Sequence, residues 1–232
     1  MTVRALGLLP ARGGSKGIPR KNLKRILGET LVAWSGRALV QAPSIQRAIC
    51  STDDAEIARE AERVGLEVPF MRPPDLAGDT AMVKDVIRHV LGVLAEQGEQ
   101  FEYVVLVQPT SPTVIVEDVE TALGLAVEHD LDTVITGFRA GMQHPAVMYT
   151  LKPDQTVSWL MEGYHERRRQ DYPEVFVRTG LVYVIRASNV LESNSIYGPR
   201  VGTHIIDESR AVTIDEELDL QLAERLLEAS NS

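Results

Sequence analysis

The chain has 232 residues, of which 44% are hydrophobic, and this length predicts one domain or one domain with an extension. The formal net charge of −9 argues against a nucleic-acid partner, and no run of residues approaches the ~18 apolar residues that a membrane span needs. The one cysteine, Cys50, excludes an internal disulfide and a thiolate-rich metal site, which fits a reducing cytoplasm. Together with the absence of a long apolar run, this predicts a cytoplasmic protein without a membrane partner.

The first predicted strand, Ala5–Leu9, leads directly into a basic, glycine-rich loop. Between positions 12 and 25 there is no acidic residue, and the cations are Arg12, Lys16, Arg20, Lys21, Lys24 and Arg25. Glycines at 13, 14 and 17 permit positive φ and a close approach of backbone N–H groups to an anion, and Ser15 adds a hydroxyl donor. Ligands of α/β sheets bind outside the carboxyl ends of the strands, so the loop predicts a polyphosphate cradle.

The loop matches neither of the common phosphate-binding fingerprints. It lacks the Gly-Lys-Ser/Thr ending of a Walker A sequence, and its glycines do not follow the Gly-x-Gly-x-x-Gly spacing. These differences argue against P-loop kinases and dinucleotide dehydrogenases. A solvated basic turn is the alternative interpretation of the same residues.

Apolar runs alternate with segments of helical periodicity along the next part of the chain. The further predicted strands are Ala48–Ser51, Val68–Phe70, Tyr103–Gln108 and Thr133–Gly137. The predicted helices have their apolar faces within 31–39, 57–64, 83–94 and 119–127. This order predicts a parallel sheet covered by crossover helices.

Two of these helices have recognisable ends. Asp53 with Glu56 resembles a capping box, and Gly65 is placed to end the same helix. The pair Asp79–Thr80 is typical of an N-cap for the helix that runs through Leu94. We therefore interpret Asp53 and its neighbour Asp54 as caps, although their place after a strand leaves a site role open.

The alternation fails between about 141 and 177, which predicts an inserted arm. The arm contains a charged run, 165–171, whose three arginines fit a solvated face, anion contacts or a subunit interface. A strand at Val177–Arg186 follows. The chain then closes with a helix that is led by 215–217 and carries Leu218, Leu222 and Leu226.

Five segments can now be compared with a known family. They are 12–22, Ser51–Asp54 (Ser-Thr-Asp-Asp), Gln108–Pro112 (Gln-Pro-Thr-Ser-Pro), Arg168–Asp171 (Arg-Arg-Gln-Asp) and Ile214–Asp219 (Ile-Asp-Glu-Glu-Leu-Asp). In this order they resemble the acylneuraminate cytidylyltransferase family, also called CMP-N-acetylneuraminic acid synthetases. The resemblance implies an α/β, Rossmann-like nucleotidyltransferase three-layer sandwich with a mostly parallel sheet. It also implies a single cytidylyltransferase domain over 1–232, with 141–177 as the dimerisation arm of a homodimer or a higher oligomer.

The resemblance further implies a reaction and the residues that perform it. In that family the anomeric hydroxyl of a nonulosonic acid, a nine-carbon α-keto sugar acid, attacks the α-phosphate of CTP, with Mg²⁺ as cofactor. The implied nucleotide-binding residues are Arg12, Gly14, Ser15, Lys16, Lys21, Asn22 and Arg72. The implied sugar-binding residues are Gln108, Arg169, Gln170 and Tyr183, and the two from the arm would act in the neighbouring subunit's site. The implied catalytic residues are Lys21, Arg12 and Asp215, and Asp215 is also the implied metal ligand.

Three departures from the family pattern bear on the metal and the substrates. Many relatives have an aspartate where this chain has Thr213, so we expect one protein carboxylate on the metal instead of two. Thr179–Gly180 replaces an Asn-Gly pair near the sugar, and Met82–Val83 replaces two serines near the nucleotide. Without the resemblance, Asp215 also fits a helix N-terminal carboxylate, and His144 fits a structural histidine.

Two other functions remain open from the sequence. Synthetases that activate the eight-carbon acid KDO share the fold, but they commonly carry an aspartate in the segment matched here by Thr110–Ser111, where this chain has none. A catalytically silent sugar-nucleotide binder would keep the cradle, and Thr213 is its only support in the sequence.

Overall fold

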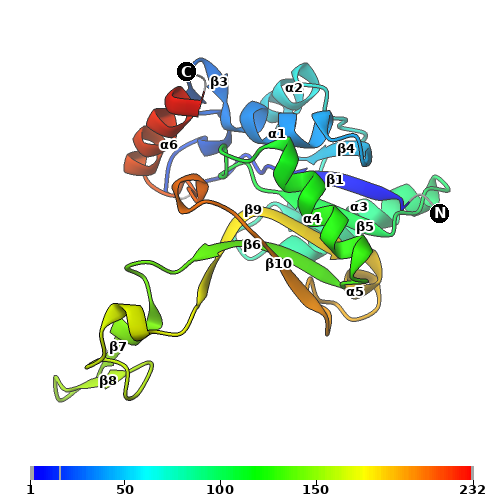
Figure 1. Cartoon of the computed structure of the whole chain (residues 1–232). Helices are drawn as coiled ribbons and strands as arrows, with labels where there is room; N and C mark the ends of the chain where they lie inside the picture. The colour runs from blue at the N-terminus through cyan, green and yellow to red at the C-terminus, as the bar shows by residue number, and fades with distance from the viewer. Residues whose placement is uncertain (1–2, 16, 231–232) are drawn as a thin grey trace.

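A twisted sheet forms the centre of the protein, whose computed structural model describes residues 3–15 and 17–230 (Figure 1). Within these residues the sheet has six strands in the order β10-β6-β9-β5-β1-β4. They are β1 (Ala5–Pro10), β4 (Ile45–Ser51), β5 (Tyr103–Val107), β6 (Thr133–Arg139), β9 (Phe176–Arg186) and β10 (Val201–Ile205). Only β9 runs antiparallel to its neighbours in this sheet, so the mostly parallel sheet is confirmed.

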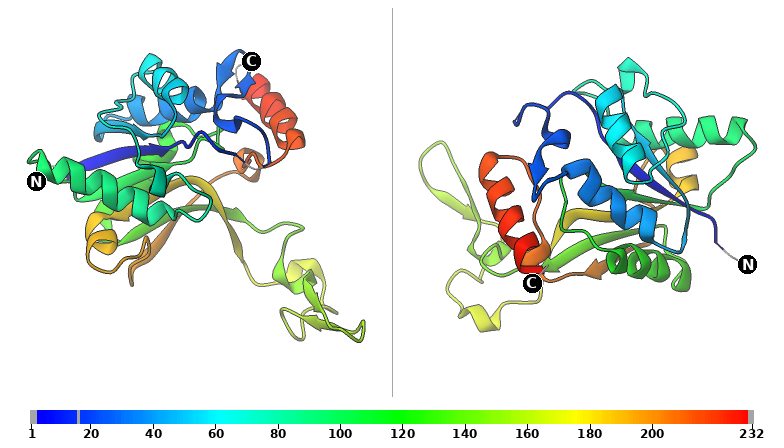
Figure 2. Two further views of the ribbon diagram at one scale, coloured as in Figure 1. Left: turned by 180° about the vertical axis from the view of Figure 1, so that it is seen from behind. Right: turned by 90° about the horizontal axis from the view of Figure 1, so that it is seen from above.

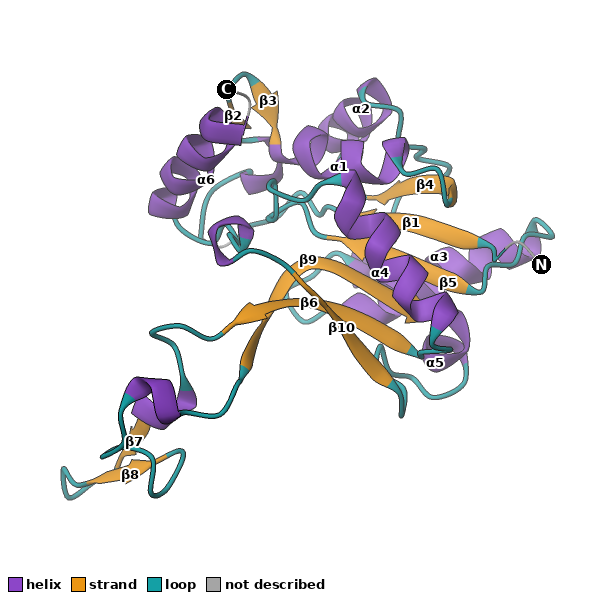
Figure 3. Cartoon of the chain, viewed as in Figure 1, coloured by secondary structure: helices purple, strands orange, loops and turns teal. Residues whose placement is uncertain are grey.

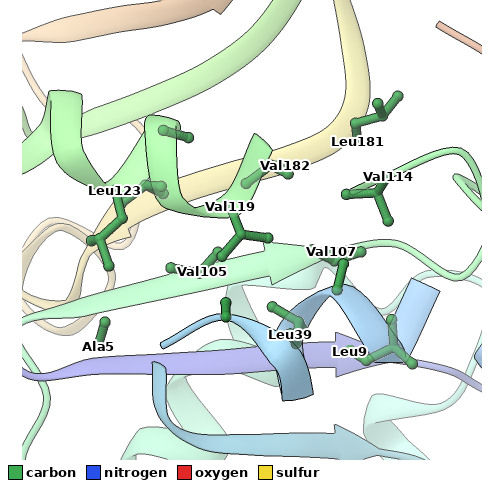
Figure 4. Close-up of a cluster of buried hydrophobic side chains, with 14 of the residues drawn as sticks. Ala5, Leu9, Leu39, Val105, Val107, Val114, Val119, Leu123, Leu181 and Val182 are labelled. Carbon is green, nitrogen blue, oxygen red and sulfur yellow. The ribbon is translucent and has the colours of Figure 1, made fainter. Parts of the chain in front are cut away.

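Helices cover both faces of the sheet and give the predicted three layers (Figure 2). One face carries α1 (Leu31–Gln41), α2 (Ala55–Arg63) and α4 (Val116–Glu128), and the other carries α3 (Val83–Glu96) and α5 (Ala187–Leu191). Successive side chains of a strand point to opposite faces. Leu9 of β1 therefore packs under α1 and α4, whereas Leu8 packs on the α3 side (Figure 4).

The last helix, α6 (Glu217–Ser230), packs beside the short strand β2 (Arg25–Ile26), which pairs with β3 (Glu29–Thr30). The residues of this third apolar cluster are Ile18, Ile26, Leu31, Val212, Ile214, Ala223 and Leu227. The predicted helix is confirmed, and Leu226 of its predicted apolar face packs against this cluster beside Leu220, Ala223 and Leu227. The other two predicted residues, Leu218 and Leu222, are 71% and 50% exposed. Among the helices in the described part of the chain, none combines the length and the apolar character needed to cross a membrane.

The segment between β6 and β9 projects away from the body of the molecule (Figure 3). It contains the hairpin β7 (Tyr149–Leu151) and β8 (Val157–Trp159), and the 3-10 turns η3 (Pro145–Val147) and η4 (Arg169–Asp171). The remaining 3-10 turns of the described chain are η1 (Lys21–Leu23), η2 (Pro74–Leu76) and η5 (Glu208–Arg210). This projection spans the arm predicted from the break in the strand and helix alternation.

The strand predicted at Val68–Phe70 is wrong. Only Glu67 reaches β4, where its backbone N–H donates to Ala48 O at 2.8 Å and its carbonyl accepts from Cys50 N at 2.9 Å. Pro69 has no N–H with which to continue a ladder. The chain therefore leaves the sheet after one bridge.

Two of the predicted caps also differ from the structure. Asp54, and not Asp53, caps α2, because its carboxylate accepts from the N–H groups of Glu56 and Ile57. Helix α3 begins at Val83 after Met82, without a side-chain cap, so the Asp79–Thr80 cap is wrong. Gly65 follows α2 with φ +95°, and the predicted end of that helix is confirmed.

We predict different costs for truncating two leucines of α6. Leu227 is 8% exposed and Leu222 is 50% exposed, so Leu227→Ala leaves a cavity that Leu222→Ala does not. Leu227→Ala is expected to lower the free energy of unfolding by about 2 kcal/mol or more, and Leu222→Ala by less than about 0.5 kcal/mol. Urea denaturation of the two variants measures the difference, and equal losses would mean that α6 packs by another face.

Candidate active site

An open cavity of about 550 Å³ lies at the carboxyl ends of β1 and β5. Its walls come from the loop after β1, the segment around η2, the first turn of α3, the turn after β5, and the residue just before α6. The lining residues are Pro10, Arg12, Gly14, Ser15, Gly17, Lys21, Asn22, Arg72, Leu76, Gly78, Asp79, Ala81, Val83, Val86, Gln108, Pro109, Thr110 and Asp215. The neighbouring strands β1 and β5 are parallel, so both deliver their following loops to the same edge of the sheet.

Lys21 and Asp215 meet at one wall of the cavity, although 194 positions separate them in sequence. Lys21 Nζ lies 3.0 Å from Asp215 Oδ1 and donates to the backbone carbonyl of Ile214 at 2.7 Å. The Lys21 side chain is 15% exposed, whereas that of Asp215 is 75% exposed. The ammonium group is therefore held in place, and the carboxylate keeps an open side toward solvent.

Arg12 is the second cation of this wall. Its Nη1 lies 3.0 Å from Asp79 Oδ1, and Asp79 also lines the cavity. Two contacts fix the backbone around it: Asn22 Nδ2 donates to Arg12 O at 2.8 Å, and Gly13 N donates to Asp53 Oδ1 at 2.9 Å. Asp53 therefore anchors the loop to the end of β4, which is the site role that its position after a strand left open.

The loop glycines allow close packing. The positive φ that glycine permits is not adopted at Gly13 or Gly14. A Cβ at Gly17 would lie 2.7 Å from the carbonyl oxygen of Asp215, and one at Gly13 would lie 2.8 Å from Asp54 Oδ2. Around Gly14 no atom of the described residues lies within 4 Å of such an atom, and Gly14 lines the open cavity.

Arg72 forms a buried part of the cavity wall. Its side chain donates to Ser51 Oγ at 3.0 Å and to the carbonyl of Ser51, and the residue is 6% exposed. Burial lowers the pKa of this guanidinium from its ordinary value. These contacts fix Arg72 against the end of β4, beside the cation Arg12.

Several cations of the basic loop point away from the cavity. Arg20 pairs with Asp54 at 3.2 Å and Glu56 at 2.8 Å, Lys24 lies 3.7 Å from Glu217, and Arg25 lies 3.8 Å from Glu60. None of these three cations lines the cavity. The predicted cradle is therefore made by fewer charges than the sequence suggests, and Lys16 lies outside the described residues.

Gln108 reaches the cavity from the end of β5. A Cβ on Gly180 would lie 3.4 Å from Gln108 Oε1, so Gly180 faces this amide directly. Thr179 itself is 7% exposed, and its hydroxyl lies 2.7 Å from that of Thr136. The small residue at 180 leaves room for the Gln108 side chain.

Arg169, Gln170 and Tyr183 do not line this cavity. The first two line a second cavity of about 720 Å³ at the root of the arm. Tyr183 is 7% exposed and packs in the core on the α3 side, where burial raises the pKa of its hydroxyl. One copy of the chain thus separates the predicted sugar-binding residues other than Gln108 from the predicted nucleotide-binding residues.

His144 supports the base of the arm. Its ring accepts from Ala146 N at 3.1 Å, contacts Pro173 O at 2.9 Å and stacks on Tyr172 with the ring centroids 4.9 Å apart. The residue is 5% exposed. These contacts agree with the structural interpretation of this histidine.

The sequence did not indicate some residues of the cavity. Asp79 was interpreted as a cap, although a carboxylate directly after Gly78 also fits a loop that faces a cation. Leu76, Val83 and Val86 give the cavity an apolar side, and nothing in their pattern separates them from ordinary core residues.

The site can be compared with known proteins at this point. A family model described as "Cytidylyltransferase" matches residues 6–226. The "CMP-N,N'-diacetyllegionaminic acid synthase" of Campylobacter jejuni is 30% identical over 95% of this chain and 94% of its own length. The protein of that name from Legionella pneumophila is 29% identical, with 97% of both chains covered. The "Pseudaminic acid cytidylyltransferase" of Campylobacter jejuni is 25% identical over 99% of this chain and 98% of its own length.

Solved structures resemble the fold at lower identity. A CMP:2-keto-3-deoxy-manno-octonic acid synthetase complexed with CTP has a TM-score of 0.72 at 15% identity, with 98% of this chain and 99% of that chain covered. A 4-diphosphocytidyl-2C-methyl-D-erythritol synthase from Anaerococcus prevotii has a TM-score of 0.67 at 12% identity, with 98% and 100% covered. At these identities the likeness shows the nucleotidyltransferase fold alone.

We predict that two alanine substitutions in the loop differ in their effect. A methyl group at Gly17 would meet the Asp215 carbonyl, whereas one at Gly14 meets no atom of residues 3–15 and 17–230 within 4 Å. Gly17→Ala is expected to lower the free energy of unfolding by about 1–3 kcal/mol, and Gly14→Ala to change it by less than about 0.5 kcal/mol. Thermal or urea unfolding measures both. If Gly17→Ala is as stable as Gly14→Ala, the loop does not pack on the Asp215 segment as described.

Proposed function

Because the chain belongs to the cytidylyltransferase family, we propose that it is a CMP-sugar synthetase that transfers CMP from CTP to a nonulosonic acid. Relatives named for legionaminic and pseudaminic acid match it over nearly their whole length. The observation that carries the proposal is the meeting of Arg12, Lys21 and Asp215 in one cavity at the carboxyl ends of β1 and β5.

The chemistry explains why cations gather there. The anomeric oxygen of the sugar would attack the α-phosphorus of CTP and form a new P–O bond. The bond from that phosphorus to the bridging oxygen breaks, pyrophosphate leaves with the electron pair, and the hydroxyl proton passes to solvent. Charge develops on phosphate oxygens throughout, so positioned cations supply most of the catalysis.

In the proposed mechanism Lys21 and Arg12 exchange carboxylate partners for phosphate oxygens. Each cation is held by a carboxylate at 3.0 Å, Lys21 by Asp215 and Arg12 by Asp79. A triphosphate carries more charge than one carboxylate and offers several acceptor oxygens, so it competes well for both groups. The exchange leaves the Asp215 carboxylate free for another cation.

The residues present fit a divalent cation that is shared with the nucleotide. In the described residues there is no group of three or more His, Cys, Asp or Glu side chains that could hold a metal by themselves. Mg²⁺ is commonly bound by one or two carboxylates together with substrate phosphates. We propose that Asp215 supplies the carboxylate and that Mg²⁺, when bound, neutralises charge on the phosphate oxygens.

For the sugar, we propose that the site is completed by a second copy of the chain. Gln108 would contact the sugar from the cavity's own subunit, and the arm of the partner would bring Arg169 and Gln170 to it. Exposed apolar side chains on the arm, among them Leu151 and Leu160 at 62% and 57% exposure, support burial of the arm against another copy.

The proposed cosubstrate CTP is a cytoplasmic nucleotide, which agrees with a cytoplasmic reaction.

Pyrophosphate release from CTP and Mg²⁺ tests the proposed function. The protein is supplied separately with N-acetylneuraminate, legionaminate, pseudaminate or KDO, with controls that lack sugar or contain EDTA. Turnover with a nine-carbon acid, lost in EDTA, is the expected result. Turnover with KDO alone would identify the eight-carbon reaction instead, and CTP binding without turnover on any of the four acids would favour a silent binder.

We predict that Lys21→Ala lowers turnover by about 100-fold or more, because a positioned charge at the reacting phosphate is lost. Lys24→Ala is the matched control, since Lys24 does not line the cavity and its pair with Glu217 is long and exposed. The control is expected to keep wild-type kcat and KM. Equal kinetics of Lys21→Ala and wild type, with both proteins folded, would remove Lys21 from the site.

We also predict that Arg169→Ala raises the KM for the sugar by about tenfold or more, while the KM for CTP changes little, because a charged contact to the sugar carboxylate is lost. Arg167→Ala is the control: this neighbouring arm arginine lies over the Tyr164 ring, 4.5 Å from its centroid, and does not line the second cavity. An increase in the KM for CTP alone would place Arg169 at the nucleotide instead.

A further inference from the structure

A buried ion pair lies behind the wall of the active-site cavity. Asp118, in the first turn of α4, is 1% exposed, and its carboxylate accepts from the N–H of Ile115 at 3.1 Å. Arg210 binds both carboxylate oxygens, with Nη1–Oδ2 at 2.6 Å and Nη2–Oδ1 at 2.9 Å. His204 Nε2 lies 3.2 Å from Oδ1. This arrangement leaves Arg210 little freedom to move, because a two-point guanidinium–carboxylate contact fixes orientation as well as distance.

The carboxylate of this pair is ionised. Burial raises the pKa of Asp118, but hydrogen bonds from Arg210 and from the Ile115 N–H outweigh it and bring the pKa below its ordinary value. Replacing one partner would therefore leave a buried charge without its counter-ion.

The backbone that follows Arg210 leads directly to the cavity. Thr113 Oγ1 donates to Arg210 O at 2.7 Å, and Ile214 N donates to Thr110 O at 2.8 Å. The segment 210–214 is thus tied at both ends to the turn that follows Gln108. Ile214 then presents its carbonyl to Lys21 Nζ, and Asp215 presents its carboxylate.

Neither Asp118 nor Arg210 lines the cavity, so neither is placed to touch a substrate there. Buried ion pairs often contribute little net stability compared with apolar residues of similar size. Arg210 of this pair lies five positions before Asp215 in the chain. We propose that Arg210 is a positioning residue, held by Asp118, that sets where Asp215 and Lys21 stand in the cavity. This role rests on the proposed function, in which Asp215 holds the metal and Lys21 the reacting phosphate.

The test uses Arg210→Lys, which keeps the charge and loses the two-point contact. Arg186→Lys is the matched control, because Arg186 pairs with Asp130 and Asp132 and its side chain is 21% exposed against 28% for Arg210. It lies at the opposite end of the sheet from the cavity, since it pairs with Tyr103 at the start of β5.

Two readouts are measured on the full-length variants. Hydrogen exchange of the backbone amides in 211–215, Ile214 above all, is expected to accelerate about tenfold or more in Arg210→Lys and to stay unchanged in Arg186→Lys. The Mg²⁺ concentration for half-maximal turnover is expected to rise about tenfold, with kcat falling about 10- to 100-fold, because small displacements of catalytic groups are costly. Wild-type exchange in 211–215, or a wild-type Mg²⁺ requirement, would overturn the proposal.

A second variant keeps the test decisive if Arg210→Lys does not fold. Thr113→Val is close to isosteric and removes only the hydrogen bond to Arg210 O, so it is expected to move both readouts in the same direction by a smaller factor. No movement in either readout would overturn the proposal.

The variant Asp215→Asn distinguishes a failure of the proposed function from a failure of the positioning role. If it stays fully active, the proposed role of Asp215 fails, whereas an inactive Asp215→Asn beside unaffected Arg210 and Thr113 variants refutes the positioning role alone.

Discussion

The contact between Lys21 and Asp215 is the interaction on which the site depends. Two buried apolar residues next in sequence to this contact hold its two segments in place. Ile18 precedes Lys21 by three positions and is 1% exposed, and Ile214 directly precedes Asp215 and is fully buried. Both belong to the third apolar cluster, which packs α6 against β2 and α1. Burial of these neighbours brings the first loop and the last helix together, and the charged groups follow. The hydrophobic effect therefore positions an ion pair that would be weak if it were fully exposed.

The sequence predicted the parts of the fold that local patterns determine. Apolar runs located β1, β5 and β6, and helical periodicity located α1 to α4. It failed where one proline or one distant partner decided the outcome. Pro69 ends the contact with β4 after a single bridge, and Asp79 binds Arg12 instead of capping α3. The first result follows from a proline inside the predicted strand itself, which argues locally against a ladder there. The second is not visible in a window of neighbouring residues, because it depends on a cation far away in the chain.

The charges of the basic loop illustrate the same limit. The sequence shows how many cations the loop carries, but the acidic partner of each cation decides in which direction its side chain points. Arg20, Lys24 and Arg25 find acidic partners on α2 or α6 or just before them, while Arg12 and Lys21 face the cavity. The family resemblance named Arg12, Lys21, Asn22, Arg72 and Gln108, which all line the cavity, and their contacts with substrates stay predictions. It also named Tyr183, which is buried in the core on the α3 side. Arg169 and Gln170 lie at the root of the arm in a single copy, so their proposed contact with the sugar depends on an assembly that local patterns do not encode.

A double-mutant cycle between Lys21 and Asp215 tests the central claim most directly. Turnover is measured for Lys21→Met, for Asp215→Asn and for the double variant, at saturating CTP, Mg²⁺ and the preferred sugar acid. If the two residues act on the same phosphoryl transfer, each single change lowers kcat by about 100-fold or more and the double variant is little slower than the worse single one. Independent, multiplicative losses, or a wild-type rate for Asp215→Asn, would contradict the account.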